Sequence, residues 1–219
     1  MSDMITVVNF STREEWLKNR ESYIGGSDVA CILGMNPYKT NVELWREKTG
    51  RKQPEDISDK PAVKYGTDAE KYLRELFKLD FPDLEVSYTE GNSWMNDKYP
   101  FAAVSLDGWL KDRNNRLGIF ECKTATISGQ AAKAKWDNRI PDNYYCQVLY
   151  YMGVCEAEFT KLKAQLKYNH EGDDPLIVTK HYHIERQEVE EEIAYIMEKT
   201  AAFYEYIKTD KEPPLTINF

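Results

Sequence analysis

The stretch "SLDGWLKDRNNRLGIFECK", residues 105–123, predicts two short β-strands joined by a polar hairpin turn. The letters "DRNNR" suit such a turn, because asparagine tolerates left-handed backbone angles. The same stretch carries Asp107, Glu121 and Lys123, which belong to the residue types whose burial costs the most free energy. The group that offsets the cost of burying these charges indicates the function of the hairpin.

Side-chain alternation along the strands brings the acids together. Glu121 and Lys123 share one face of the second strand, because successive side chains point to opposite sides. Pairing across the turn places Asp107 close to Glu121. Two adjacent carboxylates repel each other and each is costly to bury. Mg²⁺ removes both objections, since it takes oxygen ligands and commonly one or two carboxylates.

The segment 61–79, "PAVKYGTDAEKYLRELFKL", predicts a helix with Pro61 in its first turn. Helical spacing gives it a core-facing stripe of Ala62, Gly66, Ala69, Leu73, Leu76 and Phe77. Glu70 falls on this stripe and needs a partner, which a metal ion or Lys123 would supply. The residues placed away from the stripe are Asp68, Lys71, Arg74, Glu75 and Lys78.

Each of these charged residues also fits a purely structural role. Asp107 suits a turn before Gly108, Glu121 and Lys123 suit an exposed cross-strand pair, and Glu70 suits the boundary of a helix. The combination of an Asp, a Glu-x-Lys one hairpin later and a core-facing Glu upstream is more specific than any one of them. It favours a metal site.

Three blocks in this order, "GTDAE", "SLDG…ECK" and "YYCQVLYYM", resemble the YqaJ-type exonucleases, whose relatives include phage lambda exonuclease. These belong to the PD-(D/E)xK nuclease superfamily. The resemblance extends from about Trp16 to Gly153, and Leu106 stands where the superfamily motif has Pro. It implies an α/β (α+β) fold with a restriction-endonuclease-like core, in which helices flank a mixed central β-sheet.

The resemblance also implies roles for the charged residues. Asp107, Glu121, the backbone carbonyl of Cys122 and the helix carboxylate Glu70 would hold metal. The expected cofactor is Mg²⁺, with Mn²⁺ as the alternative, at two ions per site. Two cations can clamp the attacking and leaving oxygens of a displacement at phosphorus. Lys123 would position or activate the attacking water and offset negative charge.

Two further pairs are assigned by the same resemblance. Tyr144 and Gln147 match a Y-x-x-Q pair beside the active site; the alternative is a core face with one satisfied Gln. Arg20 and Ser27, in "RESYIGGSD", match a pocket for the 5′-phosphate of a DNA end. Arginine gives bidentate donors to phosphate, and Ser27 is expected as the N-cap of a helix whose N–H groups favour an anion. A plain glycine-rich helix cap is the alternative.

Composition limits the class of protein. A formal net charge of −8 over 219 residues argues against a protein that grips nucleic acid over its whole surface, but allows a local basic groove. The start "MSDMITVVNFSTREEW" lacks a signal peptide, and no apolar run approaches the ~20 residues of a membrane span. The four cysteines form no CxxC pair, which predicts neither zinc nor disulfides. We expect a cytoplasmic protein with no membrane partner.

The remaining elements complete a single expected nuclease domain over residues 1–219, with N-terminal helices within 12–50, a catalytic core at about 61–184 and a C-terminal helix at about 185–208. Further helices are expected at 12–20, 27–34, 41–50, 129–138 and 142–155, and extended segments at 84–90, 101–111, 117–124, 157–168 and 176–184. Alternation in the penultimate segment predicts a solvated face for Lys161, Lys163 and Lys167.

The function implied by the resemblance is a metal-dependent deoxyribonuclease that digests linear double-stranded DNA from 5′ to 3′ in phage-type homologous recombination. Its expected partners are double-stranded DNA ends, a single-strand annealing protein and further copies of the chain, in a homo-oligomer such as a trimer. The alternatives are an endonuclease of the same superfamily, a CRISPR-associated iron–sulfur exonuclease, which needs four clustered cysteines, and a catalytically inactive DNA-binding protein.

Overall fold

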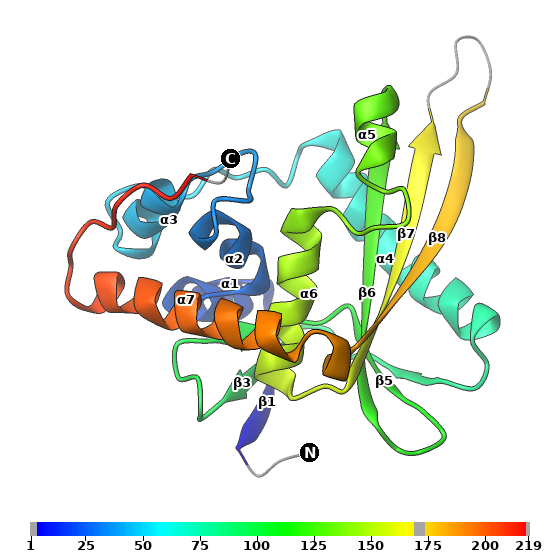
Figure 1. Cartoon of the computed structure of the whole chain (residues 1–219), viewed down its shortest axis with the longest axis horizontal. Coiled ribbons are helices and arrows are strands. Elements are labelled where there is room, and N and C mark those ends of the chain that lie inside the picture. The colour runs from blue at the N-terminus through cyan, green and yellow to red at the C-terminus, as the bar shows by residue number, and fades with distance from the viewer. Residues whose placement is uncertain (1–3, 169–173, 218–219) are drawn as a thin grey trace.

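The computed structural model describes residues 4–168 and 174–217 (Figure 1). In this part of the chain the larger sheet has five strands in the order β2-β5-β6-β7-β8. Its strands are β2 (Glu85–Ser87), β5 (Gly108–Lys111), β6 (Leu117–Ile127), β7 (Phe159–Tyr168) and β8 (Leu176–Glu185). Only β6 and β7 run parallel, and the other neighbours are antiparallel. The predicted mixed sheet is confirmed.

The hairpin that the sequence predicts joins β5 to β6. Trp109 pairs with Ile119 and Gly108 pairs with Phe120. In the turn Asn115 has a φ of 61°, which is the left-handed conformation that asparagine tolerates. Asp107 directly precedes β5, and continuing this register by one residue sets it opposite Glu121, so the hairpin brings the two acids close together.

A second, smaller sheet has its strands in the order β1-β3-β4, and the sequence predicts only part of it. Its strands are β1 (Ile5–Asn9), β3 (Asn92–Asn96) and β4 (Ala103–Val104). Neither β1 nor β3 is expected from the sequence. In β3 the strand pattern is obscured because the segment begins and ends with asparagine, a residue typical of turns. Both asparagines are buried: Asn92 donates to the carbonyl of Leu106, and Asn96 donates to that of Val154.

Helices cover both faces of the larger sheet, with α4 behind it and α6 in front of it in Figure 1. The helices are α1 (Arg13–Ser22), α2 (Gly26–Ile32), α3 (Asn41–Lys48), α4 (Pro61–Asp80), α5 (Gln130–Ala134), α6 (Asp142–Cys155) and α7 (Glu190–Lys208). The expectation that Ser27 is an N-cap is wrong, because α2 begins one residue earlier and Gly25 is its N-cap. Among the described residues, none of these helices is long and apolar enough to cross a membrane.

Helix α4 packs on the sheet through a smaller core of Ala69, Leu73, Phe77, Leu110, Phe120, Cys122 and Phe159. The predicted stripe is only partly right. Ala62 and Leu76 are exposed, whereas Arg74 is buried. The guanidinium of Arg74 stacks 3.7 Å from the ring centroid of Tyr88 and donates to a main-chain carbonyl, so burial leaves its charge partnered.

The expected solvated face of β7 is also wrong, because α4 covers it. Lys163 is only 2% exposed, and its Nζ lies 2.6 Å from Oδ2 of Asp80, the last residue of α4. Lys167 lies over the ring of Tyr65 on the same helix. A buried ammonium requires a paired carboxylate, so the ion pair of Lys163 with Asp80 fixes the end of α4 against the sheet.

We predict that Asp80→Asn lowers the free energy of unfolding by roughly 1–3 kcal/mol, because it leaves the buried Lys163 ammonium without its carboxylate. The matched control is Asp83→Asn. Asp83 pairs with Arg113 where both side chains are largely exposed, and such pairs contribute at most about 1 kcal/mol. Chemical denaturation at pH 7 measures both losses, and equal losses would contradict the prediction.

The same variant gives a pH dependence. The hydrogen bond from Lys163 holds the pKa of Asp80 below its usual range. Stabilisation by this carboxylate is therefore complete above its unfolded-state pKa of about 4 and is lost as the pH falls through the lower folded-state value. The stability difference between wild type and Asp80→Asn should disappear in acid.

Candidate active site

Asp107 is held from two sides just before β5 begins. Its Oδ2 accepts a hydrogen bond of 2.9 Å from the backbone N–H of Cys122 and lies 3.3 Å from Sγ of the same residue. Nη1 of Arg74 on α4 donates to the carbonyl oxygen of Asp107 at 2.6 Å. Strand β6 therefore fixes the carboxylate of Asp107, and α4 fixes its main chain.

Glu121 is the most deeply buried acid of the group, with 2% of its side chain exposed. Its Oε1 lies 2.6 Å from Nζ of Lys123, which shares the same face of β6, and accepts a hydrogen bond of 3.1 Å from Nε2 of Gln147 on α6. Its Oε2 is buried and has no hydrogen-bond partner among the described residues. A buried carboxylate oxygen in this state is unfavourable unless something binds it.

Helix α6 presents three side chains to this carboxylate and its lysine. Nε2 of Gln147 donates to the hydroxyl of Tyr151 at 2.6 Å as well as to Glu121. The ammonium of Lys123 lies 5.0 Å from the ring centroid of Tyr144, within the range of a cation–π contact. The structure thus brings Gln147 to Glu121 and Tyr144 to Lys123. The alternative, a plain core face with one satisfied Gln, does not require these contacts.

Glu70 completes the group from the opposite face of the sheet. It is half-buried on α4. Burial, and after it the charge of Asp107, raises the pKa of Glu70 to about 7. The same two causes raise the pKa of Glu121 to about 8. Burial alone would lower the pKa of Lys123, but Glu121 and Asp107 raise it by more, so the ammonium is held charged.

These residues fit a divalent cation, although no three His, Cys, Asp or Glu side chains in the described part of the chain are already arranged to hold a metal ion. The acids are engaged by other groups of the protein: Lys123 pairs with Glu121, and the Cys122 amide donates to Asp107. The remaining Oε2 of Glu121 lacks a donor. A cation beside it would satisfy that oxygen and neutralise the repulsion among the carboxylates.

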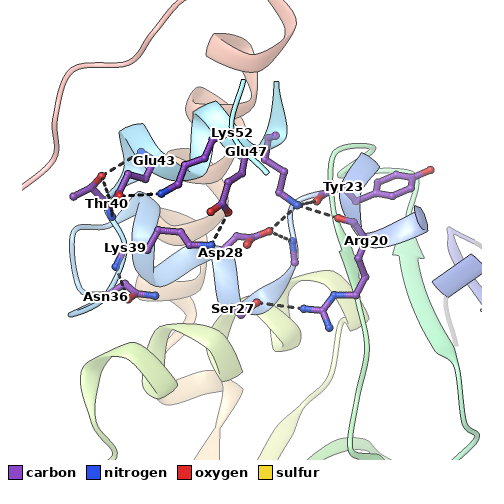
Figure 2. A network of polar contacts seen from close by, with 12 residues as sticks. Arg20, Tyr23, Ser27, Asp28, Asn36, Lys39, Thr40, Glu43, Glu47 and Lys52 are labelled. Atoms are coloured by element: carbon purple, nitrogen blue, oxygen red, sulfur yellow. Dashed lines mark hydrogen bonds and ion pairs between the residues drawn. The ribbon is translucent and has the colours of Figure 1, made fainter. Parts of the chain in front are cut away.

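The second predicted pair, Arg20 and Ser27, also meets. Nη2 of Arg20 donates to Oγ of Ser27 at 3.3 Å (Figure 2). The guanidinium stacks 4.6 Å from the ring centroid of Trp16, whose Nε1 donates to Oγ of Ser105 at 2.9 Å. Among the described residues, no carboxylate lies within ion-pair distance of Arg20. Within the part of the chain that the structure describes, Arg20 is therefore a cation without a counter-ion.

The expected anion site at the backbone of α2 is corrected by Asp28. Oδ2 of Asp28 accepts a hydrogen bond of 3.0 Å from the N–H of Gly25 and lies 3.0 Å from Nζ of Lys48. Lys48 in turn donates to the carbonyl oxygens of Arg20 and Tyr23. The protein's own carboxylate thus occupies the start of α2, a helix of seven residues, and an anion would depend on the side chains of Arg20 and Ser27.

A close packing contact joins these two groups of residues. A Cβ added to Gly26 would lie 2.2 Å from Cε1 of Tyr151, so the ring occupies the space that any other residue would need. Gly26 precedes Ser27, and the hydroxyl of Tyr151 binds Gln147. The sequence places Tyr151 on the same face as Tyr144 and Gln147 but gives it no role. Arg74, four residues after Glu70 on one helix, was likewise missed.

Comparison with known proteins identifies relatives of this arrangement. Residues 15–158 match the family described as YqaJ-like viral recombinase domain. The "Uncharacterized protein YqaJ" of Bacillus subtilis (strain 168) is 33% identical over 150 residues, which are 68% of this chain and 44% of that protein. The chain therefore spans less than half the length of this relative.

Solved structures of low sequence identity share the fold. The alkaline exonuclease LHK-Exo from Laribacter hongkongensis matches with a TM-score of 0.62 at 16% identity, over 90% of this chain and 93% of that chain. A phage-related exonuclease from Haemophilus somnus 129PT matches with a TM-score of 0.53 at 13% identity, over 86% and 96% of the two chains. These likenesses confirm the predicted restriction-endonuclease-like fold.

We predict that Gly26→Ala destabilises the protein by roughly 1–3 kcal/mol, because the added methyl group must displace the buried Tyr151 ring. Gly25→Ala is the matched control. A Cβ at Gly25 meets its nearest atoms at 3.8 Å, an ordinary contact, so the change should stay within about 0.5 kcal/mol. Urea denaturation measures the free energy of unfolding of the two variants. A Gly26→Ala protein as stable as Gly25→Ala would refute the close contact.

Proposed function

The chain belongs to the YqaJ-like viral recombinase domain family, and from this premise we propose that it is a metal-dependent exonuclease that digests linear double-stranded DNA from 5′ to 3′. The observation that carries the proposal is the pairing of buried Glu121 with Lys123 and Gln147, next to Asp107 and Glu70. A binding protein has no need for clustered acids that are costly to bury.

The acids of the site would hold the metal. Asp107, Glu121 and the backbone carbonyl of Cys122 are the proposed ligands of Mg²⁺, or of Mn²⁺ in its place, with Glu70 in support. When bound at two ions per site, the metal would supply Lewis-acid activation of water and neutralise charge on the scissile phosphate. Supporting this assignment are the donor-free Oε2 of Glu121 and the preference of such ions for carboxylate and carbonyl oxygens.

Lys123 provides fixed positive charge where negative charge grows during cleavage. Its ammonium remains charged at neutral pH because Glu121 and Asp107 raise its pKa. A preorganised donor of this kind stabilises the transition state more than the ground state. Gln147 holds Glu121 in place and the ring of Tyr144 supports the ammonium, so these two residues orient the reacting groups.

Arg20 and Ser27 would bind the 5′-phosphate of a DNA end. A terminal phosphate carries more charge than an internal diester, and arginine matches its oxygens with two parallel hydrogen bonds. Trp16 stacks on Arg20 and binds Ser105, two residues before Asp107. These contacts would hold the proposed pocket for the DNA end at a fixed position relative to the acids, and this supports the proposal of an exonuclease over an endonuclease.

The proposed setting is phage-type homologous recombination, in which a single-strand annealing protein would take up the strand that the nuclease exposes. We further propose a homo-oligomer, such as a trimeric ring. A ring would keep a chain of net charge −8 on its substrate by topology, since electrostatic attraction over the whole surface is not available. Sedimentation at working concentration tests this point, and a monomer would contradict it.

We predict that Lys123→Ala and the longer, uncharged Lys123→Met lower the rate of DNA cleavage at least about 100-fold, because both remove the ammonium group that offsets growing charge. The assay is digestion of end-labelled linear duplex with Mg²⁺. Lys208→Ala, on α7, is the control and should cleave at the wild-type rate. Wild-type protein that binds linear duplex but leaves it intact would show a binding protein instead.

We predict that Arg20→Ala mainly removes the preference for a 5′-phosphate. Wild type should digest 5′-phosphorylated duplex about tenfold faster or more than 5′-hydroxyl duplex, and the ratio should approach one in the variant, since the guanidinium binds the phosphate bidentately. Lys18→Ala removes one exposed charge from the same helix and should leave the ratio unchanged. Cleavage of covalently closed circles by wild type would favour an endonuclease.

A further inference from the structure

Tyr151 lies between the end pocket and the acids, and the proposed chemistry gives it no role. It is only 6% exposed on α6. Its ring fills the space above Gly26 so closely that a Cβ there would stand 2.2 Å from Cε1 of the ring. The next residue is Ser27, whose Oγ accepts the hydrogen bond from Arg20. The hydroxyl end of the Tyr151 ring, with Oη 3.0 Å from that Cβ position, therefore lies directly against the residue that precedes Ser27.

The hydroxyl at this same end of Tyr151 also accepts a hydrogen bond from Gln147. The amide nitrogen of Gln147 has two hydrogens, and its two acceptors are the Tyr151 hydroxyl at 2.6 Å and Oε1 of Glu121 at 3.1 Å. These acceptors together fix the rotation of the amide. Without the hydroxyl, Gln147 would have one acceptor left and its side chain could rotate away from Glu121.

The three side chains that connect α2 to the acids are buried. Glu121, Gln147 and Tyr151 are each less than a tenth exposed, so a shift of the ring cannot be absorbed by solvent. A phosphate bound by Arg20 and Ser27 would constrain the start of α2, and hence the surface on which the ring rests. The effect would reach Glu121 through one ring and one amide.

We propose that Tyr151 is a positioning residue that couples the filling of the 5′-phosphate pocket to the placement of Glu121. This inference rests on the proposed function and goes beyond it, because it states how a bound DNA end changes the metal site. Under this coupling a terminal phosphate raises kcat as well as lowering KM, whereas a pocket that only anchors the end would lower KM alone.

The test compares Tyr151→Phe with Tyr150→Phe. Phenylalanine keeps the ring and removes one hydroxyl in each case. The hydroxyl of Tyr150 donates to the carbonyl oxygen of Ile24 at 3.0 Å and is not bonded to Gln147, so this neighbour is a matched control for loss of a buried hydrogen bond. The substrates are linear duplexes with a 5′-phosphate or a 5′-hydroxyl.

We expect the phosphate to raise kcat in wild type by about fivefold or more, the usual lower end of coupling between sites. In Tyr151→Phe this advantage in kcat should fall towards one while the advantage in KM remains, because Arg20 and Ser27 are intact. Tyr150→Phe should behave as wild type. Loss of kcat and KM alike on both substrates would show a merely structural residue and overturn the proposal, as would an unchanged kcat ratio.

A binding measurement separates this inference from the proposed activity. Mn²⁺ affinity is measured by titration, with and without a 5′-phosphorylated duplex, and coupling between the two ligands must be reciprocal. The duplex should tighten Mn²⁺ binding about fivefold in wild type and Tyr150→Phe but not in Tyr151→Phe. If wild type cleaves no DNA and this coupling is present, only the exonuclease proposal fails. If wild type shows no coupling, the role of Tyr151 is refuted whether or not DNA is cleaved.

Discussion

The structure depends on keeping the carboxylate of Glu121 buried in the middle of a sheet. Desolvation of such a group is repaid only by a partner of opposite charge and by hydrogen bonds of good geometry. Lys123, two residues along the same strand, supplies the charge, and Gln147 on α6 supplies the hydrogen bond. One oxygen is still left without a donor. The site therefore retains a buried oxygen without a hydrogen-bond donor, which a neutral residue at this position would have avoided. Glu121 is thus better explained by function than by stability.

Strand β6 places this carboxylate where helices on both faces of the sheet contribute residues to the site. One face packs against α6, which brings Tyr144, Gln147 and Tyr151; the other packs against α4, which brings Glu70 and Arg74. Asp107, the residue just before β5, is held beside β6 by the backbone N–H of Cys122. No single element carries the whole set, so the mutual position of the helices and the sheet determines the geometry. The ion pair between Asp80 and the buried Lys163 fixes α4 in that arrangement.

The sequence predicts those features whose cause is local. The hairpin follows from strand alternation and a turn that accepts a left-handed Asn115, and helix α6 lies between Pro141 and the left-handed Glu156. Features that depend on a partner distant in the sequence were missed. Lys163 alternates like a solvent-facing residue, but α4 covers it, and Arg74 is buried because Asp107 and Tyr88 receive it. Strand β1 pairs with β3, β3 also pairs with β4, and buried asparagines of β3 bind distant carbonyl groups, so none of these partners is local in the sequence.

The negative net charge of the chain is compatible with a nucleic-acid substrate, because the positions of its ion pairs and of its unpaired charges differ. Many surface cations are already paired with acids, as Arg46 is with Glu212 and Lys52 with Glu43, so they add little attraction for phosphate at a distance. Arg20 has no such counter-ion among the described residues, while Glu70 and Glu121 repel an approaching phosphate whenever they are ionised. A divalent cation at those acids would reverse the local sign of the potential. Under the proposed function, metal and DNA phosphate would therefore favour each other's binding, and the attraction that the whole surface lacks would be concentrated where cleavage is proposed.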